Sequence, residues 1–334
     1  MKAMIMAALG SPEVLQAREL AVPELPDASH CLVRVHAAGV NPLDCRIRRL
    51  NPYHPNHFPA VLGCDGAGVV ERAGSACKRF KAGDEVYFFN AGLGGNEGGS
   101  YAQFTTVHAD YLARKPKNAS MQEAAALPLV WITVWEALIN RGALEPRQRI
   151  LIHAGAGGVG HIAIQLARFL RAQVATTVSG SEKARFVQSL GAERVIDYTQ
   201  EEFVAAAKAW TNGEGVDIVL DSVGGETFLR SFEAVRIFGR VITLLATPID
   251  MAHANKARAR NLIIGYEGMA APMALGNHRA RLAQTRILEQ GARLFEQGKL
   301  KVHISDTLPL ERAAQAHTLI EAGHTQGKIV LEID

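Results

Sequence analysis

Hydrophobic residues follow two patterns along this chain, and the change falls near residue 121. Beyond it, short continuous apolar runs alternate with segments whose apolar residues recur at every third or fourth position. A continuous run is typical of a strand buried on both faces of a parallel sheet, and the wider spacing is typical of an amphipathic helix. The alternation predicts a doubly wound, six-stranded parallel sheet within an α/β fold. The expected strands are 149–155, 173–179, 194–198, 216–223, 239–247 and 261–267, with helices at 157–172, 181–192, 201–210 and 225–235.

Before residue 121 the chain is rich in glycine, proline and short runs of β-branched or aromatic residues. Runs of this kind between turn residues predict strands, here 31–40, 67–74 and 84–89. The glycine-rich stretch 92–100 is expected to be a loop. We therefore expect an antiparallel, barrel-like first domain.

The last part of the chain has an amphipathic helical pattern at 279–300, a second expected helix at 310–322 and a final expected strand at 327–333. Because the parallel sheet already has its six strands by residue 267, this tail is expected to return to the first domain. The predicted domains are 1–122 together with 270–334, and 123–269.

Composition excludes several classes of protein. The 334 residues are 48% hydrophobic, which is enough for a full core and excludes intrinsic disorder. The 36 basic and 33 acidic residues give a net charge of +3 without a basic stripe, so no nucleic-acid partner is expected. The four cysteines form no CxxC pair, and the apolar run 124–135 is too short to cross a bilayer. We expect a cytoplasmic protein with reduced thiols and no membrane segment.

A glycine pattern follows the first strand of the expected sheet. Gly155, Gly157 and Gly160 form GxGxxG, placed between a strand and a helix. In that context the pattern is typical of a dinucleotide-binding loop. Gly155 is expected to permit the tight turn, Gly157 the close approach of a pyrophosphate, and Gly160 the close packing of the helix. The free N–H groups and the positive end of the helix then face the phosphates. The expected contacts are Gly155, Ala156, Gly157, Gly158, Val159 and Gly160.

The second strand indicates which dinucleotide is bound. Sites that prefer NAD usually carry an acidic residue about 20 residues after the loop, but no acid occurs from Ala172 to Ser181. Ser179, Ser181 and Lys183 stand there instead, and hydroxyls with a cation suit a 2′-phosphate. NADP(H) is the expected cofactor. Ser181 is also the expected N-cap of its helix, which should end before Gly191.

Several longer motifs together resemble the medium-chain dehydrogenase/reductase superfamily, and within it the zinc-free quinone oxidoreductases of the zeta-crystallin type. The motifs are AAGVNPLD (37–44), GCDGAGVVERAG (63–74), KAGDEV (81–86), AALPLVWITVWEAL (125–138), HAGAGGVGHIAIQLA (153–167), LGAERVIDY (190–198), DSVGG (221–225) and GKIVL (327–331). The resemblance implies a GroES-like catalytic β-barrel domain, a Rossmann domain and a homodimer.

The resemblance also bears on metal binding. Zinc-dependent members carry a cysteine where this chain has Asn41, a His-Glu pair where it has Cys64 and Asp65, and a third ligand near Leu129. Only Cys64 could bind zinc, whereas a catalytic zinc needs three protein ligands. No metal is expected. Without a Lewis acid, alcohol oxidation is disfavoured, and reduction of an electron-poor quinone or α,β-unsaturated carbonyl remains feasible.

Candidate catalytic residues come from the same comparison. The Asn41 amide either donates to a substrate oxygen or only fixes the turn before Pro42. Tyr53 lies one residue away from the position of a proton-donating tyrosine in related enoyl reductases. Alternatively, Tyr53 is only an aromatic residue that lines the site. Arg46 stands where many quinone oxidoreductases have tyrosine.

Further cofactor contacts are expected from the family or from strand ends, where doubly wound folds bind ligands. Thr133 matches the position beside the nicotinamide amide. Tyr198 either packs on the adenine or belongs to the core, Tyr266 meets either the cofactor or a dimer partner, and Lys328 is either at the cleft or on the surface. The remaining strand-end candidates are Ser222 and Ala246.

Three alternatives to a small-molecule quinone or enone reductase stay open. An enoyl-thioester reductase would need a basic entry, which Arg46, Arg48 and Arg49 could supply. A non-catalytic NADPH-binding protein and a zinc-type alcohol dehydrogenase are the other two.

Overall fold

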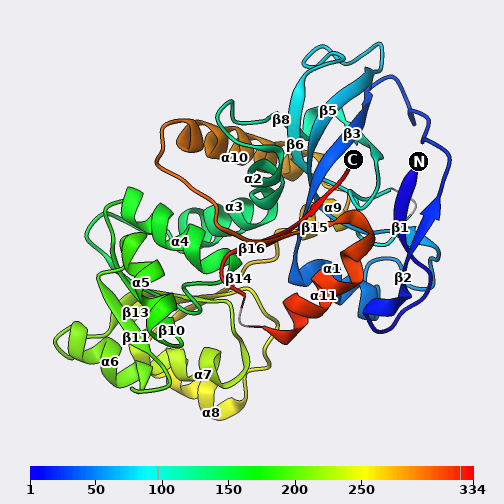
Figure 1. Cartoon of the computed structure of the whole chain (residues 1–334). Coiled ribbons are helices and arrows are strands. Elements are labelled where there is room, and N and C mark those ends of the chain that lie inside the picture. The colour runs from blue at the N-terminus through cyan, green and yellow to red at the C-terminus, as the bar shows by residue number, and fades with distance from the viewer. Residues whose placement is uncertain (96–97, 324) are drawn as a thin grey trace. The chain divides into compact units, whose positions relative to one another are not determined.

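The computed structural model describes residues 1–95, 98–323 and 325–334, so part of the expected 92–100 loop lies outside the described residues. The chain divides into two compact units, 1–132 with 270–334, and 133–269 (Figure 1). The first boundary falls ten residues after the expected one at 122, because the helical segment that follows residue 120 packs mainly on the first unit's strands.

The second unit contains the predicted six-stranded parallel sheet, in the order β11-β10-β9-β12-β13-β14. This order places the first strand in sequence at the centre of the sheet, as the doubly wound fold requires. The prediction of fold class is confirmed. The strands are β9 (Arg149–Ile152), β10 (Gln173–Val178), β11 (Arg194–Asp197), β12 (Val216–Asp221), β13 (Val235–Thr243) and β14 (Ile263–Tyr266).

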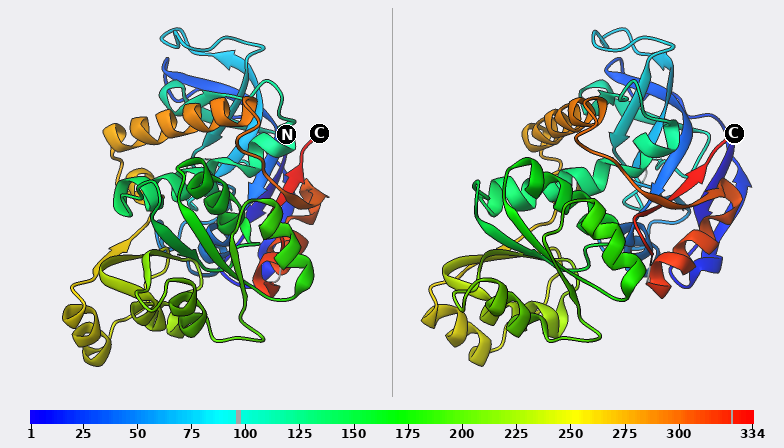
Figure 2. Two further views of the ribbon diagram at one scale, coloured as in Figure 1. Left: turned by 90° about the vertical axis from the view of Figure 1, so that its left-hand side faces the viewer. Right: turned by 60° about the vertical axis from the view of Figure 1, so that its left-hand side comes forward.

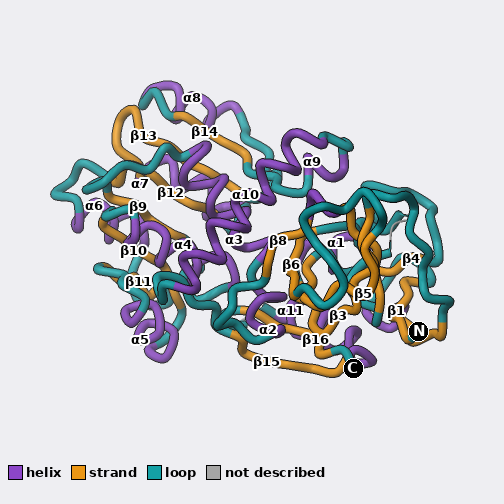
Figure 3. The backbone as a smooth tube through the Cα atoms, turned by 90° about the horizontal axis from the view of Figure 1, so that it is seen from above, coloured by secondary structure: helices purple, strands orange, loops and turns teal. Residues whose placement is uncertain are grey.

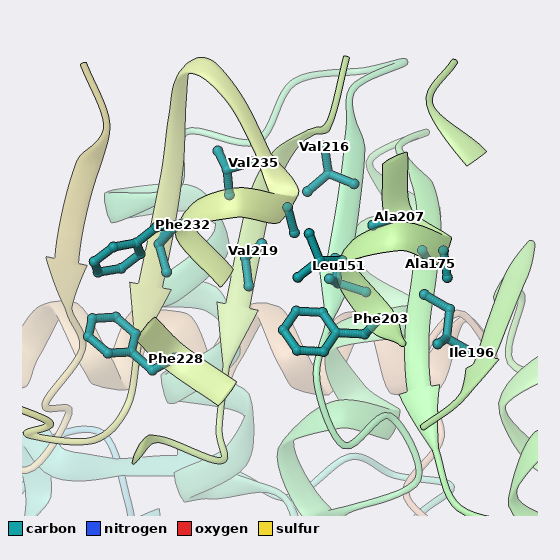
Figure 4. Close-up of a cluster of buried hydrophobic side chains, with 14 of the residues drawn as sticks. Leu151, Ala175, Ile196, Phe203, Ala207, Val216, Val219, Phe228, Phe232 and Val235 are labelled. Atoms are coloured by element: carbon teal, nitrogen blue, oxygen red, sulfur yellow. The ribbon is translucent and has the colours of Figure 1, made fainter. Parts of the chain in front are cut away.

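Helices cover this sheet, and one face has a core built largely from aromatic residues. Phe203 and Phe228 project from two helices onto strand residues such as Leu151 and Val219, all of them buried (Figure 4). A core of buried side chains makes the sheet a rigid support for the loops at its edge. The helices are α4 (Gly158–Phe169), α5 (Ser181–Ser189), α6 (Phe203–Trp210), α7 (Gly225–Ala234) and α8 (Met251–Ala259), after a π-helical segment η3 (Glu136–Arg141).

The first unit is built on a seven-stranded, mainly antiparallel sheet. The tail enters it as expected, since β16 pairs antiparallel with β3 and parallel with β15, which Figure 3 shows beside it. A second sheet has the order β2-β1-β4. The strands are β1 (Lys2–Met6), β2 (Leu15–Glu19), β3 (His30–Val40), β4 (Ala60–Val61), β5 (Asp65–Ala73), β6 (Glu85–Phe89), β7 (Phe104–His108), β8 (Leu112–Arg114), β15 (Ile304–Pro309) and β16 (Lys328–Glu332).

The long helix α10, orange in Figure 2, packs against β8 and against the helix that carries Trp131. The Trp131 indole donates a hydrogen bond of 2.7 Å to the Ile287 carbonyl, and a Cβ at Gly291 would lie 2.6 Å from the indole nitrogen. Gly291 therefore allows this close contact. The helices are α1 (Pro42–Leu50), α2 (Met121–Ala126), α3 (Pro128–Trp135), α9 (Ala271–Ala274), α10 (His278–Glu296) and α11 (Ala313–Ala322), with short 3₁₀ turns η1 (Pro12–Val14), η2 (Ala109–Tyr111) and η4 (Leu310–Arg312).

Among the described residues, no helix is both long enough and apolar enough to cross a membrane.

Candidate functional site

The glycine loop joins β9 to α4 at the carboxyl edge of the six-stranded sheet. Gly157 is the N-cap of α4, with φ −76° and ψ −178°. The first N–H groups of a helix have no partner within it, so those of Gly158, Val159 and Gly160 point out of its N-terminus together with the positive end of the helix dipole. Such a terminus binds phosphate readily.

The three glycines differ in what their missing side chains permit. A Cβ at Gly160 would lie 2.6 Å from the Gly155 Cα, so this glycine allows α4 to pack against the loop, as predicted. A Cβ at Gly157 would meet nothing closer than 3.3 Å, which leaves its Cα face open for a ligand. Gly155 lies in a tight turn, which the Gly157 N–H closes by donating to the Ala154 carbonyl at 3.0 Å. The positive φ of 52° in this turn belongs to Ala154, and a Cβ at Gly155 would lie 3.0 Å from the Thr176 Cβ.

A buried, neutral histidine precedes the glycine loop and contacts two hydroxyl groups. His153 is buried, with Nδ1 3.2 Å from the Thr177 hydroxyl and Nε2 3.0 Å from the Ser231 hydroxyl. Ser231 already donates to the Thr227 carbonyl, so it accepts from a protonated Nε2. Burial lowers the pKa of His153 to about 4, which keeps the ring uncharged at neutral pH.

The expected strand-end residues gather along the same edge, because all six strands are parallel. Asp221, Thr243 and Tyr266 are laterally paired across three neighbouring strands. Buried Asp221 accepts hydrogen bonds from the Val223 N–H at 3.0 Å and the Thr243 hydroxyl at 2.7 Å, which fixes the turn after β12. Ser179, Tyr198, Ser222, Ala246 and Tyr266 each lie at or just beyond the carboxyl end of a strand, and none is fully buried.

The turn between β10 and α5 differs in one detail from the prediction. Its N-cap is Gly180, with φ +83°, and Ser181 is the first helical residue. Glycine adopts this conformation without strain, so the chain enters the helix one residue earlier than expected. Lys183 lies in the first turn of α5 and is half-buried. Gly191, with φ +106°, follows the end of the helix as predicted.

A second group of candidate side chains lies in the first unit, at the start of α1. Asn41 is fully buried, and its Nδ2 donates to Asp65 Oδ2 at 3.0 Å. Its Oδ1 accepts from the Lys328 ammonium, which also donates to the Val40 carbonyl at 3.1 Å. Both ends of the amide are therefore held, and its orientation is fixed. The interpretation of Lys328 as a surface lysine is wrong, since its exposed fraction is 3%.

The network continues through Asp44. Its Oδ2 accepts from the Asn41 N–H at 2.8 Å and from the Tyr101 hydroxyl at 3.3 Å. Burial raises the pKa of Asp44 to about 6 and also raises that of Asp65, while it lowers that of Lys328. Two buried carboxyl groups thus face one ammonium group, an arrangement that favours retention of a proton by one of the carboxyls.

These residues do not fit a zinc ion. Asp65 uses one oxygen to accept from Asn41 and the other to accept from the Leu129 N–H, at 2.9 Å, so both oxygens of this carboxylate are engaged within the protein. Burial raises the pKa of the Cys64 thiol well above its ordinary value, which disfavours the thiolate that zinc requires. In the part of the chain that the structure describes, no three His, Cys, Asp or Glu side chains are placed to hold a metal.

The remaining candidates are distributed over both units. Tyr53 is half-buried in the turn after α1, and burial raises the pKa of its phenol. Thr133 is buried in α3. Arg48 is not part of a basic entry, because it is buried and forms an ion pair of 2.6 Å with Glu321, whereas Arg46 is exposed.

Sequence reasoning missed the buried partners of Asn41. Asp44 and Asp65 both lie in motifs already noted, and an acidic residue inside an otherwise apolar run is a signal for a buried polar network. Tyr101 and His317, whose hydroxyl and Nε2 are 3.2 Å apart, gave no local signal.

Comparison with known proteins places these features in a family. Residues 27–117 match the alcohol dehydrogenase GroES-like domain, and residues 190–331 match a family described as zinc-binding dehydrogenase. The chain is 33% identical to quinone oxidoreductase 1 of Escherichia coli over 329 residues, which cover 96% of each protein.

Solved structures agree with this relationship. An alcohol dehydrogenase superfamily protein from Novosphingobium aromaticivorans matches with a TM-score of 0.92 and 31% identity over the whole of both chains. Escherichia coli quinone oxidoreductase, crystallised with NADPH, matches with a TM-score of 0.88 and 31% identity over 99% of this chain and 100% of that one. The chain therefore belongs to the medium-chain dehydrogenase/reductase superfamily, in the quinone oxidoreductase branch of the zeta-crystallin type.

Proposed function

We propose that this chain is a zinc-independent reductase that uses NADPH to reduce a quinone or an α,β-unsaturated carbonyl. The observation that carries the proposal is the open Cα face of Gly157 at the N-terminus of α4, beside a row of strand ends. This geometry suits a pyrophosphate at the loop and the rest of a dinucleotide along the sheet edge. The relatives named quinone oxidoreductase, one of them crystallised with NADPH, support it.

The roles of the edge residues follow from their order along the sheet. Ser179, Ser181 and Lys183 are assigned to the 2′-phosphate, and Tyr198 at the end of β11 to the adenine. Ser222, Ala246 and Tyr266 end the strands on the other side of β9, where the nicotinamide half is expected. Thr133 is assigned to the nicotinamide amide from the family position alone.

When bound, NADPH supplies the hydride, and the acceptor also needs a proton to form a hydroquinone or a saturated carbonyl. The Tyr53 phenol is the proposed donor, because a phenol carries its proton at neutral pH; burial raises its pKa further, which makes it a weak general acid. Asn41 and Lys328 are proposed to keep the polar wall of the acceptor site in place, since each fixes the other's orientation. None of these steps requires a metal ion.

The test is a steady-state assay of the purified full-length chain with NADPH and a panel of quinones, 2-alkenals and enoyl thioesters. NADH and a metal chelator serve as controls. We expect NADPH to be consumed with quinones or 2-alkenals at a rate that the chelator does not change. Turnover limited to simple alcohols and NADP⁺, or turnover abolished by the chelator, would contradict the proposal.

A further inference from the structure

The turn between β10 and α5 is held by a carboxylate from the next strand. Asp197 is the last residue of β11 and is paired laterally with Val178, the last residue of β10. Its Oδ2 accepts the Gly180 N–H at 3.0 Å, and its Oδ1 accepts the Thr199 N–H at 3.0 Å and the Thr199 hydroxyl at 2.7 Å. A negative charge therefore lies against the turn that is assigned to the 2′ position of the adenosine ribose.

This charge is not neutralised by a basic neighbour. Within the described ranges, Asp197 forms no ion pair, and every donor that it binds is uncharged. Hydrogen bonds from Thr199 and Gly180 hold the pKa of the carboxyl below its usual range, so it is ionised at neutral pH. Its side chain is partly exposed and can meet a ligand at the sheet edge.

Sites that prefer NAD use a carboxylate at the end of the second strand, where it accepts a hydrogen bond from the ribose 2′-hydroxyl. The second strand of this chain, β10, carries no acid. Lateral pairing of Val178 with Asp197 brings a carboxylate to the same edge from the third strand instead. No acidic residue belongs to β10 itself, but the fold places the Asp197 carboxylate of β11 beside the end of that strand.

A positive charge acts in the opposite direction at the same turn. Lys183 lies in the first turn of α5, where the helix dipole disfavours a cation unless an anion binds there. No carboxylate pairs with Lys183 anywhere in the described part of the chain. The turn thus carries Lys183, whose charge suits a 2′-phosphate, and Asp197, whose charge suits a 2′-hydroxyl.

We propose that Asp197 is a specificity-determining residue that accepts the 2′-hydroxyl of NADH and repels the 2′-phosphate of NADPH. Lys183 sets the preference for NADPH, Asp197 limits it, and the enzyme uses both coenzymes. This inference rests on the proposed function, since it names the coenzyme range of that same site.

The test compares the ratio of kcat/KM for NADPH to kcat/KM for NADH, at a fixed quinone concentration, in wild type and Asp197→Asn. Asparagine keeps an oxygen for the Gly180 N–H and removes the charge. Loss of a like charge beside a phosphate is expected to raise the ratio by about fivefold or more, through a lower KM for NADPH. Lys183→Met is expected to lower the ratio by a similar factor.

Two controls separate charge from structure. Asp27 also holds a turn, accepting the Ser29 N–H at 2.7 Å, but it lies in the other unit, so Asp27→Asn should leave the ratio unchanged. If Asp197 only stabilised its turn, its substitution would weaken both coenzymes equally, and an unchanged ratio would overturn the inference. Should Asp197→Asn fail to fold, Asp197→Ser, which keeps an oxygen at the side chain, replaces it with the same expected result. A wild-type protein that binds neither coenzyme would instead refute the proposed function.

Discussion

The glycine loop allows stability and coenzyme binding to be perturbed separately. Gly157→Ala and Gly160→Ala add the same methyl group three residues apart, but into different surroundings. At Gly160 the new Cβ would lie 2.6 Å from the Gly155 Cα, a backbone atom that cannot turn aside. At Gly157 the nearest atom would be 3.3 Å away.

The magnitudes follow from these distances. Overpacking at Gly160 is expected to cost about 1–3 kcal/mol of unfolding free energy, less the gain from a better helix former. At Gly157 the backbone suits alanine, and the poorer N-cap costs about 0.5–1 kcal/mol. There the methyl group would hold a pyrophosphate away from the helix N-terminus. Loss of one charge-assisted hydrogen bond, about 1.5–3 kcal/mol, weakens NADPH binding by roughly 10- to 150-fold.

Urea denaturation and titration of NADPH by its fluorescence measure the two effects. Gly98→Ala is the matched control, because a Cβ there meets nothing within 4 Å. We expect Gly160→Ala to lose stability and Gly157→Ala to remain folded but bind NADPH weakly. A Gly157→Ala protein that binds NADPH as tightly as wild type would refute the assignment of this loop to the pyrophosphate.

Three further predictions concern buried charge. Lys328→Met leaves two buried carboxyl groups without their cation, so we expect the unfolding free energy to fall by about 3–5 kcal/mol in urea denaturation at pH 8. The fall should be smaller at pH 5, because those carboxyl groups take up protons there. An equal fall at both pH values would contradict the charge argument. The pKa of Asp44 rises from an ordinary 3.8 to about 6 on folding, so the contribution of this group to the unfolding free energy should fall by roughly 3 kcal/mol as the pH rises from 3.8 to 6. The difference between wild type and Asp44→Asn, measured by urea denaturation at each pH, should show that slope. The pKa of His153 falls from 6.5 to about 4, so the contribution of this group should decline by roughly 3 kcal/mol as the pH falls across this range, and the difference between wild type and His153→Gln, which remains uncharged, should show the decline.

The parallel sheet was predictable from the sequence, because strands buried on both faces consist of continuous apolar runs. The run at 216–223 became β12, and the run at 173–179 became β10. Errors occurred where one residue decides a local conformation. Gly180 rather than Ser181 begins α5, since a glycine with positive φ can replace a side-chain cap.

The polar networks were less accessible from sequence, because they join residues that are far apart along the chain. Lys328 and Asn41 are 287 residues apart and meet only because β16 pairs with β3. Asp197 escaped notice for the same reason, since its place beside β10 depends on strand register and not on distance from the glycine loop. The homodimer and the direct contact of Asn41 or Tyr53 with an acceptor stay predictions.

The most direct test of the central claim is a stopped-flow measurement of a single turnover, with NADPH bound to the metal-stripped protein and a quinone added in excess. The account predicts that NADPH is oxidised as fast as in untreated protein, and that Gly157→Ala oxidises a much smaller fraction of NADPH at coenzyme concentrations that just saturate wild type. No oxidation of NADPH until zinc is restored, or oxidation unaffected by Gly157→Ala, would contradict it.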